Sequence, residues 1–149
     1  FTVLTKNGAA AVDALHHFST GRDVLACSIS FSSEQNRAEW EPGAPPLEDR
    51  WTALAEARDR GVDTWISVEP VVHPVEALAV VRRAAEEGVG HVRVGPLNYH
   101  AHAGTVDWRT FGVDLAFALE ATGIDYYLKR DMREHMPEGF PIAKGVDAR

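Results

Sequence analysis

Residues 65–70 read WISVEP, and this stretch decides how the chain is expected to fold. Ile66 and Val68 alternate with Ser67 and Glu69, which is typical of a β-strand whose successive side chains point to opposite faces. Pro70 is expected to end the strand. A strand between two helices is expected to be buried in a sheet, where an unpaired charge is unfavourable. The Glu69 carboxylate therefore requires a cation or several hydrogen-bond donors beside it.

Segments with strand and helix patterns alternate along the whole chain. We expect strands at residues 1–6, 24–31, 63–69, 91–97 and 125–130, and helices at residues 9–18, 46–60, 74–87 and 108–121. Gly61, Gly88 and Gly123 follow the last three helices, where a residue with left-handed backbone is common. The order β-α-β-α-β-α-β-α-β predicts an α/β fold with parallel strands joined by right-handed crossovers.

Two architectures fit this order: a partial parallel (βα) barrel, an arc similar to part of a TIM barrel, and an open flavodoxin-like sheet. A dinucleotide-binding Rossmann fold has no support, because no GxGxxG motif follows the first strand. We favour the barrel arc because polar residues recur at the carboxyl ends of the strands, where α/β folds place their active sites. These residues are Lys6, Asn7, Ser28, Ser30, Ser67, Glu69, Arg93, Asn98 and Lys129. Lys6, Arg93 and Lys129 are the expected partners of Glu69.

The composition is that of one globular domain covering residues 1–149, with 45% hydrophobic and 25% charged residues. The net charge of −7 disfavours a protein that coats nucleic acid, although it allows a local basic groove. No apolar run approaches the ~20 residues of a membrane span, and no signal peptide is visible. We therefore expect a cytoplasmic protein without a membrane partner.

The chain has one cysteine, Cys27, so no disulfide forms within it. Strand parity places Cys27 on the helix-covered side with Ile29 and Phe31, where a thiol fills apolar space. His100 and His102 are two residues apart, as zinc ligands can be. No further Cys or His pair completes a tetrahedral site, so we expect no metal site and assign the loop at residues 98–107 to covering a pocket.

Several runs resemble the radical S-adenosylmethionine (radical SAM) superfamily, and within it the branch related to spore photoproduct lyase. Residues 41–50, EPGAPPLEDR, resemble the E-P-x-A-P-x-x-x-x-R pattern of that superfamily. SVEP at residues 67–70, VGPLN at 94–98 and YYLK at 126–129 resemble the narrower branch. The similar runs cover nearly the whole chain. The resemblance implies the C-terminal part of a partial barrel that lacks its first two βα units, and Phe1 lies inside a predicted strand, so we expect a piece of a longer protein.

The resemblance also implies S-adenosylmethionine as cofactor. It assigns Ser30, Arg50, Ser67 and Glu69 to the cofactor, and Lys6, Arg93, Asn98, His100 and Lys129 to the substrate. It assigns no catalytic residue. The four-iron four-sulfur cluster of the superfamily is held by a CxxxCxxC motif, which this sequence lacks, so a cluster is expected only in a longer parent protein.

Three functions are compatible with these observations. The first is the C-terminal part of a radical SAM enzyme, of lyase or oxidoreductase type, acting on nucleic acid or on another substrate. The second is a non-catalytic half barrel that binds a nucleotide-like ligand. The third is an α/β domain with a phosphate or carbohydrate substrate, in which Glu69 is a general base. In each case the strand at residues 1–6 would be an exposed parallel edge, through which a homodimer is an expected assembly.

Overall fold

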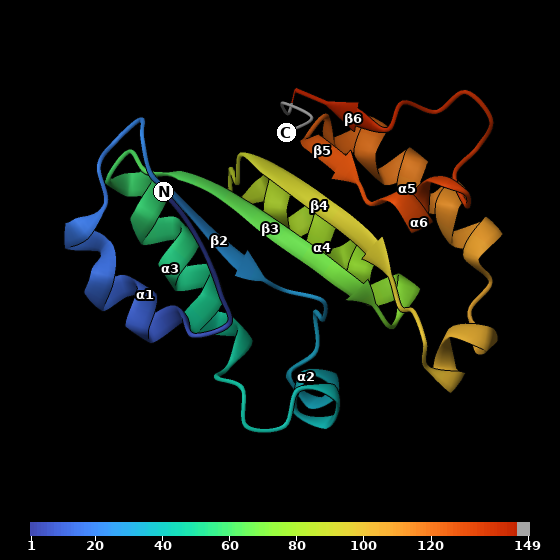
Figure 1. The fold of residues 1–149 in the computed structure, drawn as a ribbon, viewed down its shortest axis with the longest axis horizontal. Coiled ribbons are helices and arrows are strands. Elements are labelled where there is room, and N and C mark those ends of the chain that lie inside the picture. Colours follow the sequence, from blue (N-terminus) through green and yellow to red (C-terminus); the bar gives the residue numbers. More distant parts are fainter. Residues whose placement is uncertain (146–149) are drawn as a thin grey trace.

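The computed structural model describes residues 1–145, and in it one sheet holds all strands in chain order (Figure 1). The strands are β1 (Thr2–Thr5), β2 (Val24–Ser28), β3 (Asp63–Val71), β4 (His91–Pro96), β5 (Asp125–Leu128) and β6 (Ala143–Lys144). β1 to β5 run parallel, and β6 returns antiparallel to β5. The predicted α/β fold with parallel strands in chain order is therefore confirmed, and the reversed strand order of a flavodoxin-like sheet is excluded.

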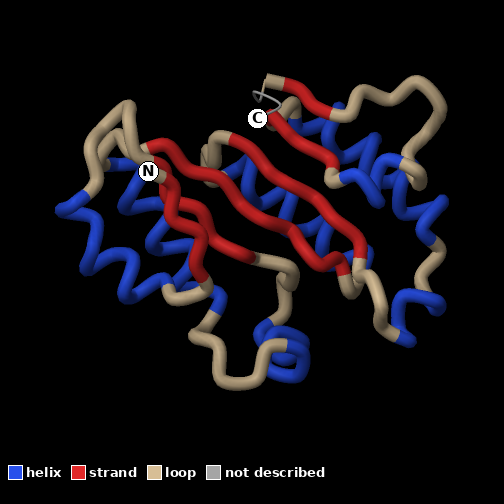
Figure 2. The backbone as a smooth tube through the Cα atoms, in the orientation of Figure 1, coloured by secondary structure: helices blue, strands red, loops and turns tan. Residues whose placement is uncertain are grey.

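Helices connect the strands, and α3 and α4 cover one face of the sheet, whereas α2 lies apart from it (Figure 2). They are α1 (Gly8–Ala14), α2 (Glu34–Trp40), α3 (Leu47–Asp59), α4 (Pro74–Glu86), α5 (Trp108–Thr122) and α6 (Arg130–Arg133), with short 3-10 helices at Leu15–His17 and Ala101–Thr105. α3 packs on β2 and β3, α4 packs on β3 and β4, and α1 and α5 pack on α3 and α4 respectively. Gly61, Gly88 and Gly123 have φ values of 73°, 72° and 68°, as predicted for residues that follow helices.

The two faces of the sheet differ in chemistry because side chains alternate along each strand. On the helix-covered face, Cys27, Ile66, Val68, Val92 and Leu128 are fully buried in one hydrophobic core. Burial raises the pKa of the Cys27 thiol to about 12. The other side, which we call the open face, carries Ser28, Trp65, Ser67, Glu69, His91, Arg93, Asp125, Tyr127 and Lys129. The predicted division into an apolar face and a polar face is confirmed.

Two local predictions are wrong. β3 does not end at Pro70 but continues to Val71, which pairs with Pro96. The register of β3 and β4 shifts between Val68 and Val71, so the hydrogen-bond ladder is irregular at Pro70, which has no N–H to donate. The Glu69–Pro70 peptide bond is cis. β2 ends at Ser28 rather than at residue 31. Neither α2 nor β6 was predicted.

β1 forms one edge of the sheet, with Phe1 62% and Leu4 50% exposed. Homodimerisation along this edge stays a prediction. Among residues 1–145, the structure has no helix with the length and apolar character needed to cross a membrane.

Candidate functional site

The carboxyl ends of β1 and β2 meet a buried ion pair in the EPGAP segment that follows α2. Glu41 forms ion pairs with Lys6 and Arg50, with both nitrogen–oxygen distances 2.7 Å, and it accepts a hydrogen bond from Arg50. Arg50 is fully buried, and it also donates to the carbonyl oxygens of Ser28, at 2.8 Å, and Pro45, at 3.1 Å. Arg50 therefore ties this segment to the end of β2, and its terminal nitrogens are occupied by the protein itself.

Two buried side-chain polar atoms in the described part of the chain have no hydrogen-bond partner. They are the hydroxyl oxygen of Ser30 and Nε of Arg50. Buried polar atoms are nearly always paired, so each implies a partner such as a water molecule or a ligand atom. Ser30 and Arg50 are also two of the residues that the family resemblance assigns to the cofactor, and that assignment stays a prediction.

Glu69 lies on the open face and pairs with Lys129, whose Nζ is 3.2 Å from the carboxylate. The pair crosses β4 at Gly95, because a Cβ atom there would lie only 2.9 Å from Cδ of Glu69 and 3.0 Å from Cγ of Lys129. Both side chains remain accessible, with 38% of Glu69 and 43% of Lys129 exposed. Of the three predicted cationic partners, Lys129 is the one that contacts Glu69, whereas Lys6 pairs with Glu41.

A row of hydrogen-bonding side chains crosses the open face beside this pair. Strand register places Ser28, Ser67, Arg93 and Tyr127 next to one another in that order. The Arg93 guanidinium lies 4.1 Å from the centroid of the Trp65 ring, so it stacks on an aromatic surface.

His91 packs against the same tryptophan. Its ring is stacked on Trp65, with the centroids 5.5 Å apart and an angle of 13° between planes. The pKa of His91 is lowered to about 4, mainly by burial and also by the charge of Arg93, whereas the charge of Asp125 opposes the shift. At neutral pH the imidazole is uncharged, so its Nε2 accepts from Nε of Arg93 at 3.4 Å.

The loop after β4 packs against α2 at the carboxyl ends of β3 and β4. His100 and His102 lie 5.3 and 5.2 Å from the Trp40 ring, and His73 lies 5.4 Å from His102, all between centroids. His102 Nε2 is 3.1 Å from the carbonyl oxygen of Val72. Within residues 1–145, no group of His, Cys, Asp or Glu side chains is arranged to hold a metal ion.

The predicted site residues thus fall into three groups. Ser67, Glu69, Arg93 and Lys129 share the open face; Lys6 and Arg50 pair with Glu41 of the EPGAP segment; and His100 packs on Trp40. Ser30 is buried two residues after the end of β2, and its hydroxyl has no partner among residues 1–145. Asn98 donates to Asp131 of α6, at 2.9 Å. Sequence reasoning missed Trp65, His91 and Tyr127, although the strand parity that placed Glu69 and Lys129 places these residues on the same face.

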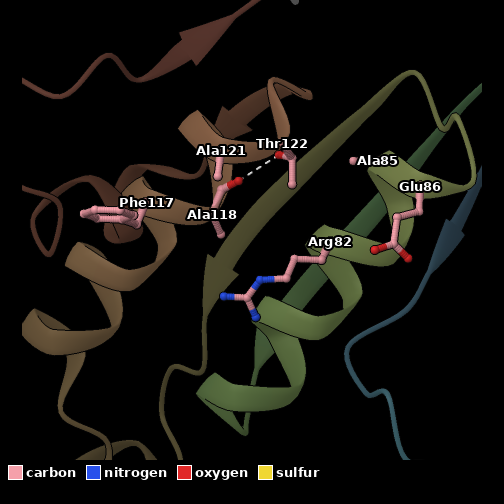
Figure 3. Close-up of a pocket in the computed structure, with 7 residues that line it drawn as sticks. All are labelled: Arg82, Ala85, Glu86, Phe117, Ala118, Ala121 and Thr122. Carbon is pink, nitrogen blue, oxygen red and sulfur yellow. Dashed lines mark hydrogen bonds between the residues drawn. The ribbon is translucent and has the colours of Figure 1, made fainter.

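A separate cavity of about 460 Å³ lies in the helix layer between α4 and α5 (Figure 3). It is lined by Arg82, Ala85, Glu86, Phe117, Ala118, Ala121 and Thr122. The Thr122 hydroxyl donates to the Ala118 carbonyl oxygen at 2.8 Å, so this polar group is already paired. None of the residues assigned to the cofactor or substrate lines this cavity.

Comparison of the chain with protein-family models, with curated proteins and with solved structures finds no match.

Proposed function

We propose that this chain is the C-terminal part of a radical SAM enzyme, contributing contacts to S-adenosylmethionine and to the substrate. In this proposal the sheet is an arc of a partial (βα) barrel that lacks its first two βα units, and the open face is the inside of the barrel. The chain-ordered parallel sheet supports it, because such a sheet with helices on one face curves toward a barrel. The resemblance of the EPGAPPLEDR and SVEP runs supports it independently.

The accessible Glu69–Lys129 pair is the observation that carries the proposal. The methionine end of S-adenosylmethionine has an ammonium group and a carboxylate, which are complementary in charge to Glu69 and Lys129. An exposed ion pair contributes only about 0–1 kcal/mol to stability, so little free energy is lost when Glu69 and Lys129 separate and pair with charged groups of a ligand. Ser67 lies on the same face, and Ser30 adds a hydroxyl that has no partner in the protein.

The described residues do not fit an iron–sulfur cluster. A cluster needs several thiolates, and the one cysteine is buried with a pKa raised to about 12. S-adenosylmethionine, when cleaved at such a cluster, supplies a radical that abstracts hydrogen. In this chain the open-face residues bind and orient, and cysteines outside this sequence would hold the cluster.

Calorimetric titration of the chain with S-adenosylmethionine tests the proposal. Glu69→Gln keeps the shape of the side chain and removes its charge, so it should weaken binding about tenfold, which corresponds to 1.4 kcal/mol. Glu48→Gln is the matched control, because Glu48 pairs with Arg83 on the helix-covered side, 3.0 Å away. The absence of binding at millimolar ligand, or equal losses for both variants, would contradict the proposal.

The second candidate is a non-catalytic half barrel that binds a nucleotide-like ligand, which the missing CxxxCxxC motif favours only if the chain is a whole natural protein. Titration with adenosine and with methionine distinguishes the two functions. A radical SAM fragment should bind the methionine end through Glu69 and Lys129. A nucleotide-binding module should bind adenosine with an affinity that Glu69→Gln does not change.

A further inference from the structure

Two arginines beside Tyr127 have no acidic partner within residues 1–145, although acids outnumber bases in the chain by 22 to 15. Among the described lysines and arginines that are at least partly buried, Arg37, Arg50, Arg83 and Lys129 each contact a carboxylate within 4.0 Å. Arg93 and Arg133 are half-buried, and no carboxylate of residues 1–145 lies within that distance of either. Placing a cation out of water without a counter-charge is unfavourable, so these two positions suggest an external anion.

Both arginines flank Tyr127. Arg93 is the register partner of Tyr127 across β4 and β5. Arg133, from α6, donates through Nη2 to the Tyr127 hydroxyl oxygen at 2.9 Å and lies 5.3 Å from the ring centroid. Because Tyr127 accepts this bond, its own hydroxyl proton is free to be donated.

Contacts with neutral groups hold both guanidiniums in place. Arg93 lies against the Trp65 ring and donates through Nε to His91, which leaves its terminal nitrogens without a hydrogen-bond partner among residues 1–145. Arg133 donates through Nε to the carbonyl oxygen of Leu128 at 2.9 Å. Such fixed guanidiniums lose little entropy on binding and suit the paired oxygens of a phosphate or carboxylate.

We propose that Arg93, Tyr127 and Arg133, with the neighbouring Ser67 hydroxyl, bind an anionic group of the substrate, either a phosphoryl group or a carboxylate. The inference rests on the proposed function only in calling the bound molecule the substrate. Two carboxylates face the same region: Glu69 is neutralised by Lys129, and Asp125 lies one register row away, beside His91.

Calorimetric titrations at low salt with two probes, inorganic pyrophosphate and succinate, test the site. The wild-type chain should bind at least one probe with one-to-one stoichiometry, and the preferred probe distinguishes a phosphoryl from a carboxylate group. Arg93→Gln should weaken that binding at least tenfold. Arg82→Gln is the matched control, because Arg82 is an exposed arginine on the helix-covered side without a carboxylate partner in the described chain, and it should bind as the wild type does.

Tyr127→Phe keeps the ring and removes the hydroxyl group, so it should weaken probe binding while leaving the near-ultraviolet circular dichroism unchanged. It thereby separates loss of the site from loss of the fold. Failure of both probes to bind, or an equal loss in Arg82→Gln, would overturn the inference. If pyrophosphate or succinate binds through Arg93 but S-adenosylmethionine does not bind, the proposed function fails and the anion site stands. If S-adenosylmethionine binds but neither pyrophosphate nor succinate binds, the anion site fails and the proposed function stands.

Discussion

Replacement of Arg50 by methionine separates a structural role for this residue from a ligand-binding role. Methionine fills much of the same volume but removes the charge and the donors. In the variant, the carbonyl oxygens of Ser28 and Pro45 lose their donor, and Glu41 retains only Lys6. Breaking a buried ion pair on one side costs about 3–5 kcal/mol. Because Lys6 still neutralises Glu41, we expect the lower end, about 3 kcal/mol.

Lys6→Met is the internal control, since Lys6 contacts the same carboxylate at the same distance of 2.7 Å as Arg50. Lys6 is 43% exposed whereas Arg50 is fully buried. An exposed pair contributes about 0–1 kcal/mol, so the control should lose little. Replacing both Arg50 and Glu41 by methionine should recover part of the loss, because no buried charge is then left without its partner.

Urea unfolding and thermal unfolding, both followed by tryptophan fluorescence, measure these differences. For a domain of about this size each kcal/mol shifts Tm by about 2–4 °C, so Arg50→Met should lower Tm by about 6–12 °C. A loss below about 1 kcal/mol in Arg50→Met, or an equal loss in Lys6→Met, would refute the reasoning. Arg50 would then be available to bind a ligand carboxylate, as the sequence resemblance implies.

Four further predictions concern the open face and the cysteine. Gly95→Ala should weaken S-adenosylmethionine binding as Glu69→Gln does, because its Cβ would displace the Glu69–Lys129 pair; calorimetry measures this, and unchanged affinity would contradict it. The pKa of His91 is lowered from 6.5 to about 4, so the unfolded chain binds more protons between these pH values and this contribution to stability is lost as the pH falls through them. Urea unfolding at pH 4.5 and 7.5 should therefore show a smaller difference for His91→Gln than for the wild type, and equal differences would exclude the effect. The Cys27 thiol, with a pKa of about 12, should react with a thiol reagent at pH 8 only after unfolding, so stoichiometric labelling of the native chain would be the contrary result. Anaerobic reconstitution should load no four-iron cluster, which iron analysis and visible absorption check; stoichiometric uptake by the monomer would contradict the assignment.

The main elements were predictable because their signals are local. Alternation in WISVEP and the glycines after α3, α4 and α5 mark a strand and helix ends without knowledge of distant contacts. The alternation of side chains along β3 placed Glu69 on the open face, and Lys129 directly follows β5 at the same edge of the sheet. These two residues form an ion pair.

The elements that were missed depend on distant residues. α2 has no buried residue, and its sequence shows no helical repeat of apolar residues. The start of α2 is fixed by Glu76 of α4, which accepts hydrogen bonds from the backbone N–H groups of Ser32 and Ser33. Trp40, at the end of α2, then meets His73, His100 and His102 from two other loops, a cluster with no sequence signal. Likewise, the burial of Arg50 has no local signal, because it depends on contacts with the EPGAP segment and with the end of β2.

The order of the strands has a consequence for how the chain acquires its structure during synthesis. From β1 to β5 each strand pairs with the one that precedes it in the sequence. During synthesis, each of β2 to β5 can therefore pair with a strand that has already been made. No strand has to be inserted later between two strands that precede it in the sequence. Paired residues of successive strands, such as Val24 and Asp63, are separated by a helical crossover, so each pairing is non-local in sequence and folding is slower than in a protein with mainly local contacts. The open face is thus assembled from β1 towards β5, and Tyr127 and Lys129 complete it last.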